Sequence, residues 1–127
     1  MTTDLFSTLE ITDQDVARQP EDLPGLFVRL ANAGDVDGLV GLYEGDAVLT
    51  TPEGVEIRGA ASIGRYFSEL LASAPVFTLG EQRPVLRLRD VALTSTRLGP
   101  DQATAEVARR QLDGTWRWVS DRPDTRR

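Results

Sequence analysis

Residues 30–67 read LANAGDVDGLVGLYEGDAVLTTPEGVEIRGAASIGRYF, and this stretch decides the expected fold. Gly34 ends one helix, because glycine readily adopts the left-handed conformation that follows many helix C-termini. Asp35 is placed to cap a second, shorter helix. A β-hairpin follows over 47–58, with its turn at the Pro-Glu-Gly sequence of 52–54. A third helix then begins at about Ala60, after the glycine that closes the hairpin.

Helical periodicity extends in both directions from this stretch. The helix that precedes Gly34 has one apolar stripe, formed by Leu23, Leu26, Phe27, Leu30 and Ala31. The helix that begins at Ala60 should run to about Ser73, where Pro75 terminates it. Its stripe consists of Ile63, Phe67, Leu70, Leu71 and Ala74.

After Pro75 the apolar period changes from 3.6 to 2, which predicts strands. We expect a long strand interrupted near Gly80 and Pro84, and a tight hairpin at Asp113-Gly114. The strand ranges are 76–79 with 85–89, 91–98, 103–112 and 115–121. The order predicts an α+β fold, with a curved antiparallel sheet wrapped around about three N-terminal helices. Such a conical half-barrel encloses an internal cavity. The expected domain spans 20–123, between a flexible arm, 1–19, and a polar tail, 124–127.

Composition excludes several kinds of chemistry. The 127 residues include no Cys, His or Lys, so thiolate, imidazole and Schiff-base catalysis are excluded, and no cofactor or metal is expected. Proton transfer must therefore use Asp, Glu or Tyr. The net charge of −6 argues against nucleic acid as a partner, and no apolar run is long enough for a membrane span. The acidic N-terminus lacks a signal-peptide pattern, so we expect a cytoplasmic location.

The sequence resembles the nuclear transport factor 2-like superfamily, specifically its SnoaL-like and ketosteroid isomerase-like branch. Two segments support this resemblance, residues 30–67 quoted above and RRQLDGTWRWVSDRPD at 109–124. The shared motifs are the Asn-Ala-Gly-Asp break, the Leu-Tyr-x-x-Asp-Ala-Val strand entry, the Arg-Gly-x-x-x-Ile-x-x-Tyr-Phe helix start and the Asp-Gly-Thr-Trp-Arg hairpin. The fold hosts isomerases, cyclases, hydrolases, dehydratases and binding proteins, so the resemblance is more specific for fold than for function.

The resemblance implies a set of acid positions. Ketosteroid isomerases place a catalytic Asp before the hairpin proline, where this chain has Thr51, and an oxyanion-hole Tyr where it has Phe27. Their remaining acid matches Glu106 by count. SnoaL-like cyclases use an Asp near the end of the last strand, which matches Asp121. The resemblance therefore predicts Asp121 as general acid or base with Glu106 as its partner, and the two missing groups argue against classical steroid isomerisation.

Strand alternation tests these assignments. Asp121 shares a parity with Arg117 and Val119, opposite Trp116 and Trp118, so an inward Asp121 requires outward tryptophans. Exposed tryptophans predict a homodimer through the outer face of the sheet. The alternative is inward tryptophans and an outward Asp121. Glu106 faces either the pocket or an arginine on a neighbouring strand.

The expected substrate is a small apolar molecule of polyketide or terpenoid type. Its binding residues would be Phe27, Tyr43, Val48, Thr51, Phe67 and Val119, although most of these are also suited to core packing. The hydroxyl of Thr51 could contact a ligand or simply satisfy the turn. Two functions remain open: a cofactor-free cyclase, dehydratase or isomerase, and a non-catalytic binding or structural homodimer of the same fold.

Overall fold

The computed structural model describes residues 16–122. Its helical elements are η1 (Pro20–Asp22), α2 (Leu23–Asn32), α3 (Val36–Val40), α4 (Ala60–Leu70) and η2 (Leu71–Ser73). Its strands are β1 (Tyr43–Thr50), β2 (Glu56–Arg58), β3 (Glu81–Gln82), β4 (Leu86–Leu88), β5 (Val91–Thr94), β6 (Thr96–Gly99), β7 (Gln102–Ala103), β8 (Ala105–Arg110) and β9 (Trp116–Arg122). Among the described residues, no helix has the length and apolar composition that a membrane span requires.

The helices begin and end where the local signals predict. Gly34 has a φ of 70° after α2, and the Asp35 side chain accepts a hydrogen bond from the backbone N–H of Gly38 at 2.9 Å. Leu23, Leu30 and other residues of the predicted α2 stripe are buried. In α4, Ile63 and Phe67 are buried, and the helix tightens into η2 before the proline. These boundaries depend on neighbouring residues alone, which explains why the sequence predicts them.

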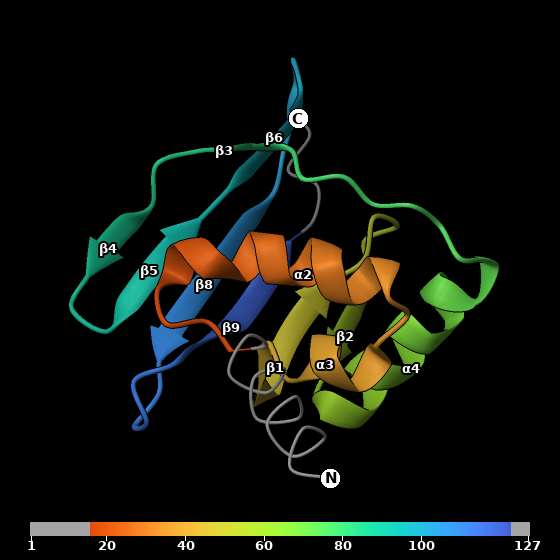
Figure 1. The fold of residues 1–127 in the computed structure, drawn as a ribbon, viewed down its shortest axis with the longest axis horizontal. Coiled ribbons are helices and arrows are strands. Elements are labelled where there is room, and N and C mark those ends of the chain that lie inside the picture. The colour runs from red at the N-terminus through yellow and green to blue at the C-terminus, as the bar shows by residue number, and fades with distance from the viewer. Residues whose placement is uncertain (1–15, 123–127) are drawn as a thin grey trace, which may run out of the picture.

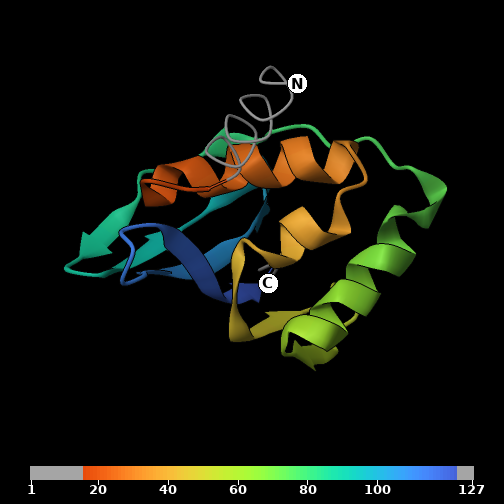
Figure 2. The same ribbon diagram turned by 60° about the horizontal axis from the view of Figure 1, so that its bottom comes forward.

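The sheet is larger and more divided than expected. Six strands lie in the order β2-β1-β9-β8-β5-β4, and β3-β6-β7 form a smaller second sheet. All pairs among the described strands are antiparallel except β1 with β9, which are parallel. Figure 1 shows the sheet behind α2, and Figure 2 shows α2 on one face with α4 beside β1 and β2. The α+β fold with a curved, unclosed sheet around three helices is thus confirmed.

Two strand predictions are wrong. Residues 76–79 form no strand, because they cross from α4 to the second sheet as extended chain. The predicted strand at 91–98 is divided at Ser95, where its first part stays in the large sheet and its second part joins the small sheet. Burial alternates in β5 but not in β6, and no glycine or proline near Ser95 marks the change of partner in the sequence.

The core lies between α2, α3, α4 and the inner face of the large sheet. It includes the aromatic side chains of Tyr43, Phe67, Trp116 and Trp118. Ala17 lies within the predicted arm and forms an isolated bridge with Trp116, and its carbonyl accepts the backbone N–H of that residue at 2.9 Å. Residues 1–15 of the predicted arm and the whole predicted tail lie outside the described residues.

Candidate functional site

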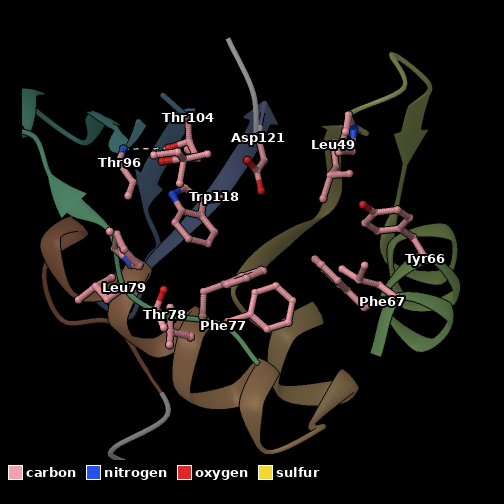
Figure 3. A pocket seen from close by; sticks show the side chains of 18 residues that line it. Leu49, Tyr66, Phe67, Phe77, Thr78, Leu79, Thr96, Thr104, Trp118 and Asp121 are labelled. Carbon is pink, nitrogen blue, oxygen red and sulfur yellow. Dashed lines mark hydrogen bonds between the residues drawn. The ribbon is translucent and has the colours of Figure 1, made fainter. Parts of the chain in front are cut away.

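A cavity of about 350 Å³ lies between the helices and the inner face of the sheet. Its walls are mostly apolar and come from α2, α4, the segment 77–80 and the strands of both sheets. Figure 3 shows the carboxylate of Asp121 and the hydroxyl of Tyr66 directed into this space, with the rings of Trp118, Phe77 and Phe67 around it. The cavity is therefore mostly apolar, with a few polar groups at defined positions.

Asp121 is one of two acids that line the cavity and are buried from water. Its side chain is 9% exposed, and its Oδ2 accepts a hydrogen bond from the Tyr43 hydroxyl at 2.5 Å. Burial, followed by the nearby charge of Glu106, raises the pKa of Asp121 from 3.8 to about 7, although the Tyr43 hydrogen bond opposes the rise. Asp121 can therefore exchange a proton near neutral pH, which a surface aspartate cannot do efficiently.

Glu106 lies directly opposite Asp121 in the β8–β9 ladder and is 6% exposed. Burial raises the pKa of Glu106, while hydrogen bonds from Thr104 and Thr94 lower it. Directly opposite side chains on antiparallel strands lie on one face and close together. The two acids are therefore neighbours inside one apolar cavity, which makes simultaneous ionisation costly.

A directed hydrogen-bond chain holds Glu106 in place. The indole Nε1–H of Trp118 donates to Thr94 Oγ1 at 3.1 Å, and the Thr94 hydroxyl donates to Glu106 Oε1 at 2.6 Å. An indole N–H can only donate, so the single hydroxyl proton of Thr94 is directed to the carboxyl group. Oε1 of Glu106 therefore acts as an acceptor toward Thr94.

A β-bulge at Val119 corrects the predicted parity of the last strand. Ala108 pairs with Trp118 and Val107 pairs with Ser120, so Val119 is an extra residue in β9. The bulge shifts the alternation by one position and brings Asp121 onto the same inner face as the tryptophans. Trp116 and Trp118 are 4% and 3% exposed, so their predicted place on the outer face is wrong. The assumption that inward tryptophans force Asp121 outward is also wrong, because it required an unbroken strand.

The structure brings together only some of the predicted binding residues. Phe27 and Phe67 line the cavity with both acids, whereas Tyr43, Val48, Thr51 and Val119 are absent from its described lining. Tyr43 is buried beneath the site and contacts Asp121 directly. Val48 lies between Ala47 and Leu49, which are buried on the inner side of β1.

Thr51 has the structural role that its position in the turn suggests. Its hydroxyl accepts the backbone N–H of Val55 at 3.0 Å, and its own N–H bonds the Val55 carbonyl at 2.9 Å. The hairpin therefore places no acid in the cavity at the position where ketosteroid isomerases have one.

Sequence reasoning missed Thr94 and the cavity-facing roles of Trp118 and Tyr66. The signal for Thr94 was its parity with Ala92 on β5, since both are buried, but only the pairing of Thr94 with Glu106 shows its partner. Among the described residues, no cluster of three or more acidic side chains could hold a metal ion.

Comparison with known proteins agrees with the geometry. Residues 25–83 match the family model of the nuclear transport factor 2 domain. No curated protein matches the chain significantly. The structure is similar to a nuclear transport factor 2-like protein with a cystatin-like fold from Novosphingobium aromaticivorans, with 20% identity, coverage of 94% of this chain and 86% of the other, and a TM-score of 0.68.

Two further solved structures extend this likeness to the expected branch. A ketosteroid isomerase-like protein from Erwinia carotovora shares 16% identity, with coverage of 84% of this chain and 94% of the other and a TM-score of 0.63. A SnoaL-like protein of unknown function from Burkholderia thailandensis shares 20% identity, with coverage of 80% and 89% respectively and a TM-score of 0.57. At these identities the likeness concerns the fold, and the predicted resemblance to this superfamily is confirmed.

Proposed function

We propose, from the nuclear transport factor 2-like fold of this chain, that its cavity binds a small, mostly apolar substrate and catalyses proton transfer without a cofactor. The reaction class is cyclisation, dehydration or isomerisation of a polyketide- or terpenoid-like molecule. One observation supports this proposal above the others: two buried acids occupy opposite positions on β8 and β9 and line the same apolar cavity. A cytoplasmic location remains a prediction of the sequence.

The two acids suit different roles. Asp121, with a pKa of about 7, is ionised often enough at neutral pH to remove a proton from a carbon next to a carbonyl group. Glu106, whose charge raises the pKa of Asp121 and whose Oε1 accepts the Thr94 hydroxyl, would be the partner that keeps the Asp121 proton exchangeable near neutral pH. Tyr43 keeps Asp121 oriented through Oδ2. The acid that exchanges the proton and the partner that raises its pKa would then come from neighbouring strands.

Proton exchange in D₂O tests this proposal without knowledge of the natural substrate. Small apolar ketones are incubated with the protein, and loss of the C–H signals next to the carbonyl is followed by proton NMR. The wild-type protein should accelerate exchange, and Asp121→Asn should lower the rate by at least ~100-fold, the scale of one general base. Glu69→Gln, at an exposed position of α4, is the matched control. An Asp121→Asn rate equal to that of the wild type would refute the role of Asp121.

A non-catalytic homodimer is the second candidate function, and the outer face of the sheet favours it. The exposed fractions of Leu86, Leu88, Val91 and Leu93 are 65%, 74%, 44% and 40%. Leu86 pairs with Leu93 and Leu88 with Val91, so these side chains form one aliphatic patch. Contiguous exposed apolar surface is typical of protein contacts. This patch, in place of the tryptophans, is the proposed interface with a second copy.

A further inference from the structure

We propose that the cavity selects organic cations, specifically apolar molecules with a protonated amine or quaternary ammonium head, which lies beside Asp121 and within the ring of aromatic side chains. The inference deepens the proposed function, since it rests on the same cavity as the ligand site. It adds the charge of the ligand, which the proposed function leaves open.

The first argument is the charge balance of the cavity. Asp121 and Glu106 are both more than nine-tenths buried, yet no arginine lines the cavity in the described part of the chain. The ion pairs of Arg58, Arg109 and Arg110 engage other carboxylates, namely those of Glu56, Glu44 and Asp90. A buried carboxylate without a positive partner is costly, and a bound cation offsets that cost. A carboxylate or phosphate ligand would instead add to it.

The second argument is the free oxygen of Asp121. Its Oδ2 accepts the hydrogen bond from Tyr43, whereas no hydrogen bond from a described residue reaches Oδ1. Figure 3 shows the carboxylate directed into the cavity. Oδ1 is therefore available to accept a hydrogen bond from an ammonium N–H, or to lie against a quaternary ammonium group.

The third argument is the aromatic lining. The rings of Trp118, Phe77, Phe67 and Tyr66 surround the space into which Asp121 points (Figure 3). Phe27 completes the set, with ring centroids 5.7 Å from Phe67, 5.9 Å from Phe77 and 6.3 Å from Trp118. Aromatic faces attract ammonium groups, and clustered rings are the usual recognition site for quaternary ammonium ligands. Rings and carboxylate together favour a cation over a neutral group of the same shape.

A matched ligand series tests the inference on the unmodified protein. The probes are 1-adamantylmethylamine, 1-adamantanemethanol and adamantane-1-carboxylate, which share one apolar cage and differ in charge. Affinities are measured at pH 8 by calorimetry and by intrinsic tryptophan fluorescence, which reports on Trp116 and Trp118 together. We expect the amine to bind at least ~10-fold more tightly than the alcohol, and the carboxylate to bind most weakly.

The outcomes separate this inference from the proposed function. An alcohol that binds as tightly as the amine would overturn the cation preference and leave the ligand cavity intact. If none of the three probes binds, both the inference and the proposed ligand site are refuted.

Variants then test whether Asp121 is the residue that attracts the ammonium group of the ligand. Asp121→Asn keeps the shape and can still accept the Tyr43 hydroxyl, and it should reduce the affinity advantage of the amine over the alcohol while alcohol binding is unchanged. Glu106 remains as the second acid of the cavity. Glu69→Gln removes an exposed charge from α4 and should change neither affinity. An equal loss of amine and alcohol binding in Asp121→Asn would indicate general damage to the cavity and would overturn the role of Asp121.

Discussion

At the scale of single residues, Asp121 combines two opposing requirements. Its burial is costly to the fold once the carboxyl group ionises, and the same burial brings its pKa to about 7. Tyr43 limits the cost by donating a hydrogen bond to Oδ2, but no described cation neutralises the charge. Stability and proton-transfer ability are therefore linked through one side chain.

This linkage predicts how stability depends on pH. An acid whose pKa is higher in the folded protein than in the unfolded chain stabilises the fold while it is protonated. For Asp121, that contribution is complete below the ordinary pKa of 3.8 and is lost as the pH rises through about 7. At ~1.4 kcal/mol per pKa unit, the loss is about 4 kcal/mol.

Asp121→Asn should therefore be more stable than the wild type at pH 8 and nearly equal to it at pH 4. Urea unfolding of both proteins at the two pH values measures the difference. The Asn side chain can still accept the Tyr43 hydroxyl, so the comparison isolates the charge. A gap that does not depend on pH would contradict the raised pKa.

Thr94 is the second residue with a testable role. It is 1% exposed, and its hydroxyl links Trp118 to Glu106. Thr94→Val keeps the volume but leaves an indole N–H and a carboxyl oxygen without their partner, so we expect the free energy of unfolding to fall by ~2–3 kcal/mol. Thr94→Ser keeps the hydroxyl and should cost less than half as much. Equal losses in the two variants would mean that packing, and not the hydrogen-bond chain, is what Thr94 supplies.

At the scale of elements, local signals were predictable and long-range pairing was not. The capping by Asp35, the left-handed Gly34 and the hairpin turn after Thr51 involve residues close in sequence. The bulge at Val119 and the parallel contact between β1 and β9 depend on strands far apart in the chain. Inward positions for Asp121 and Glu106 were expected from the family resemblance, but their partners Tyr43 and Thr94 were not.

Deleting Val119 tests whether this one extra residue is the reason for the shifted alternation at the end of β9. Without it, Trp116, Trp118 and Asp121 follow regular alternation on one face, since Ser120 already pairs with Val107 and Asp121 with Glu106. We therefore expect the shortened protein to fold with Asp121 still inside. Carboxyl ¹³C NMR titration should find the pKa of Asp121 still raised. An ordinary aspartate titration in a folded deletion variant would contradict this register.

At the scale of the whole molecule, apolar surface is unevenly distributed. The inner face of the large sheet meets the helices and the cavity, whereas the outer face at β4 and β5 exposes the aliphatic patch of Leu86, Leu88, Val91 and Leu93. These strands lie at the end of the sheet farthest from β2. A second copy packed here would cover the patch without blocking the helices.

The proposed dimer gives a prediction for this patch. The double substitution Leu86→Glu with Leu88→Glu should convert the dimer to a monomer, because it places charge in an apolar contact. Light scattering coupled to size-exclusion chromatography gives the mass directly. Leu112→Glu, at a fully exposed position (110%) in the β8–β9 turn, is the control and should remain dimeric. A wild-type protein with the mass of a monomer would refute the dimer.

The central place of β9 has a consequence for biosynthesis. β9 is the last described strand to leave the ribosome, yet it lies between β1 and β8 and joins the two parts of the large sheet. The chain made before β9 therefore leaves unpaired the edges of β1 and β8 that β9 later covers. Exposed strand edges are prone to intermolecular association. A nascent chain that stalls before Trp116 would thus lack Asp121 and the strand that pairs with both β1 and β8. Such a chain would be a natural substrate for chaperones.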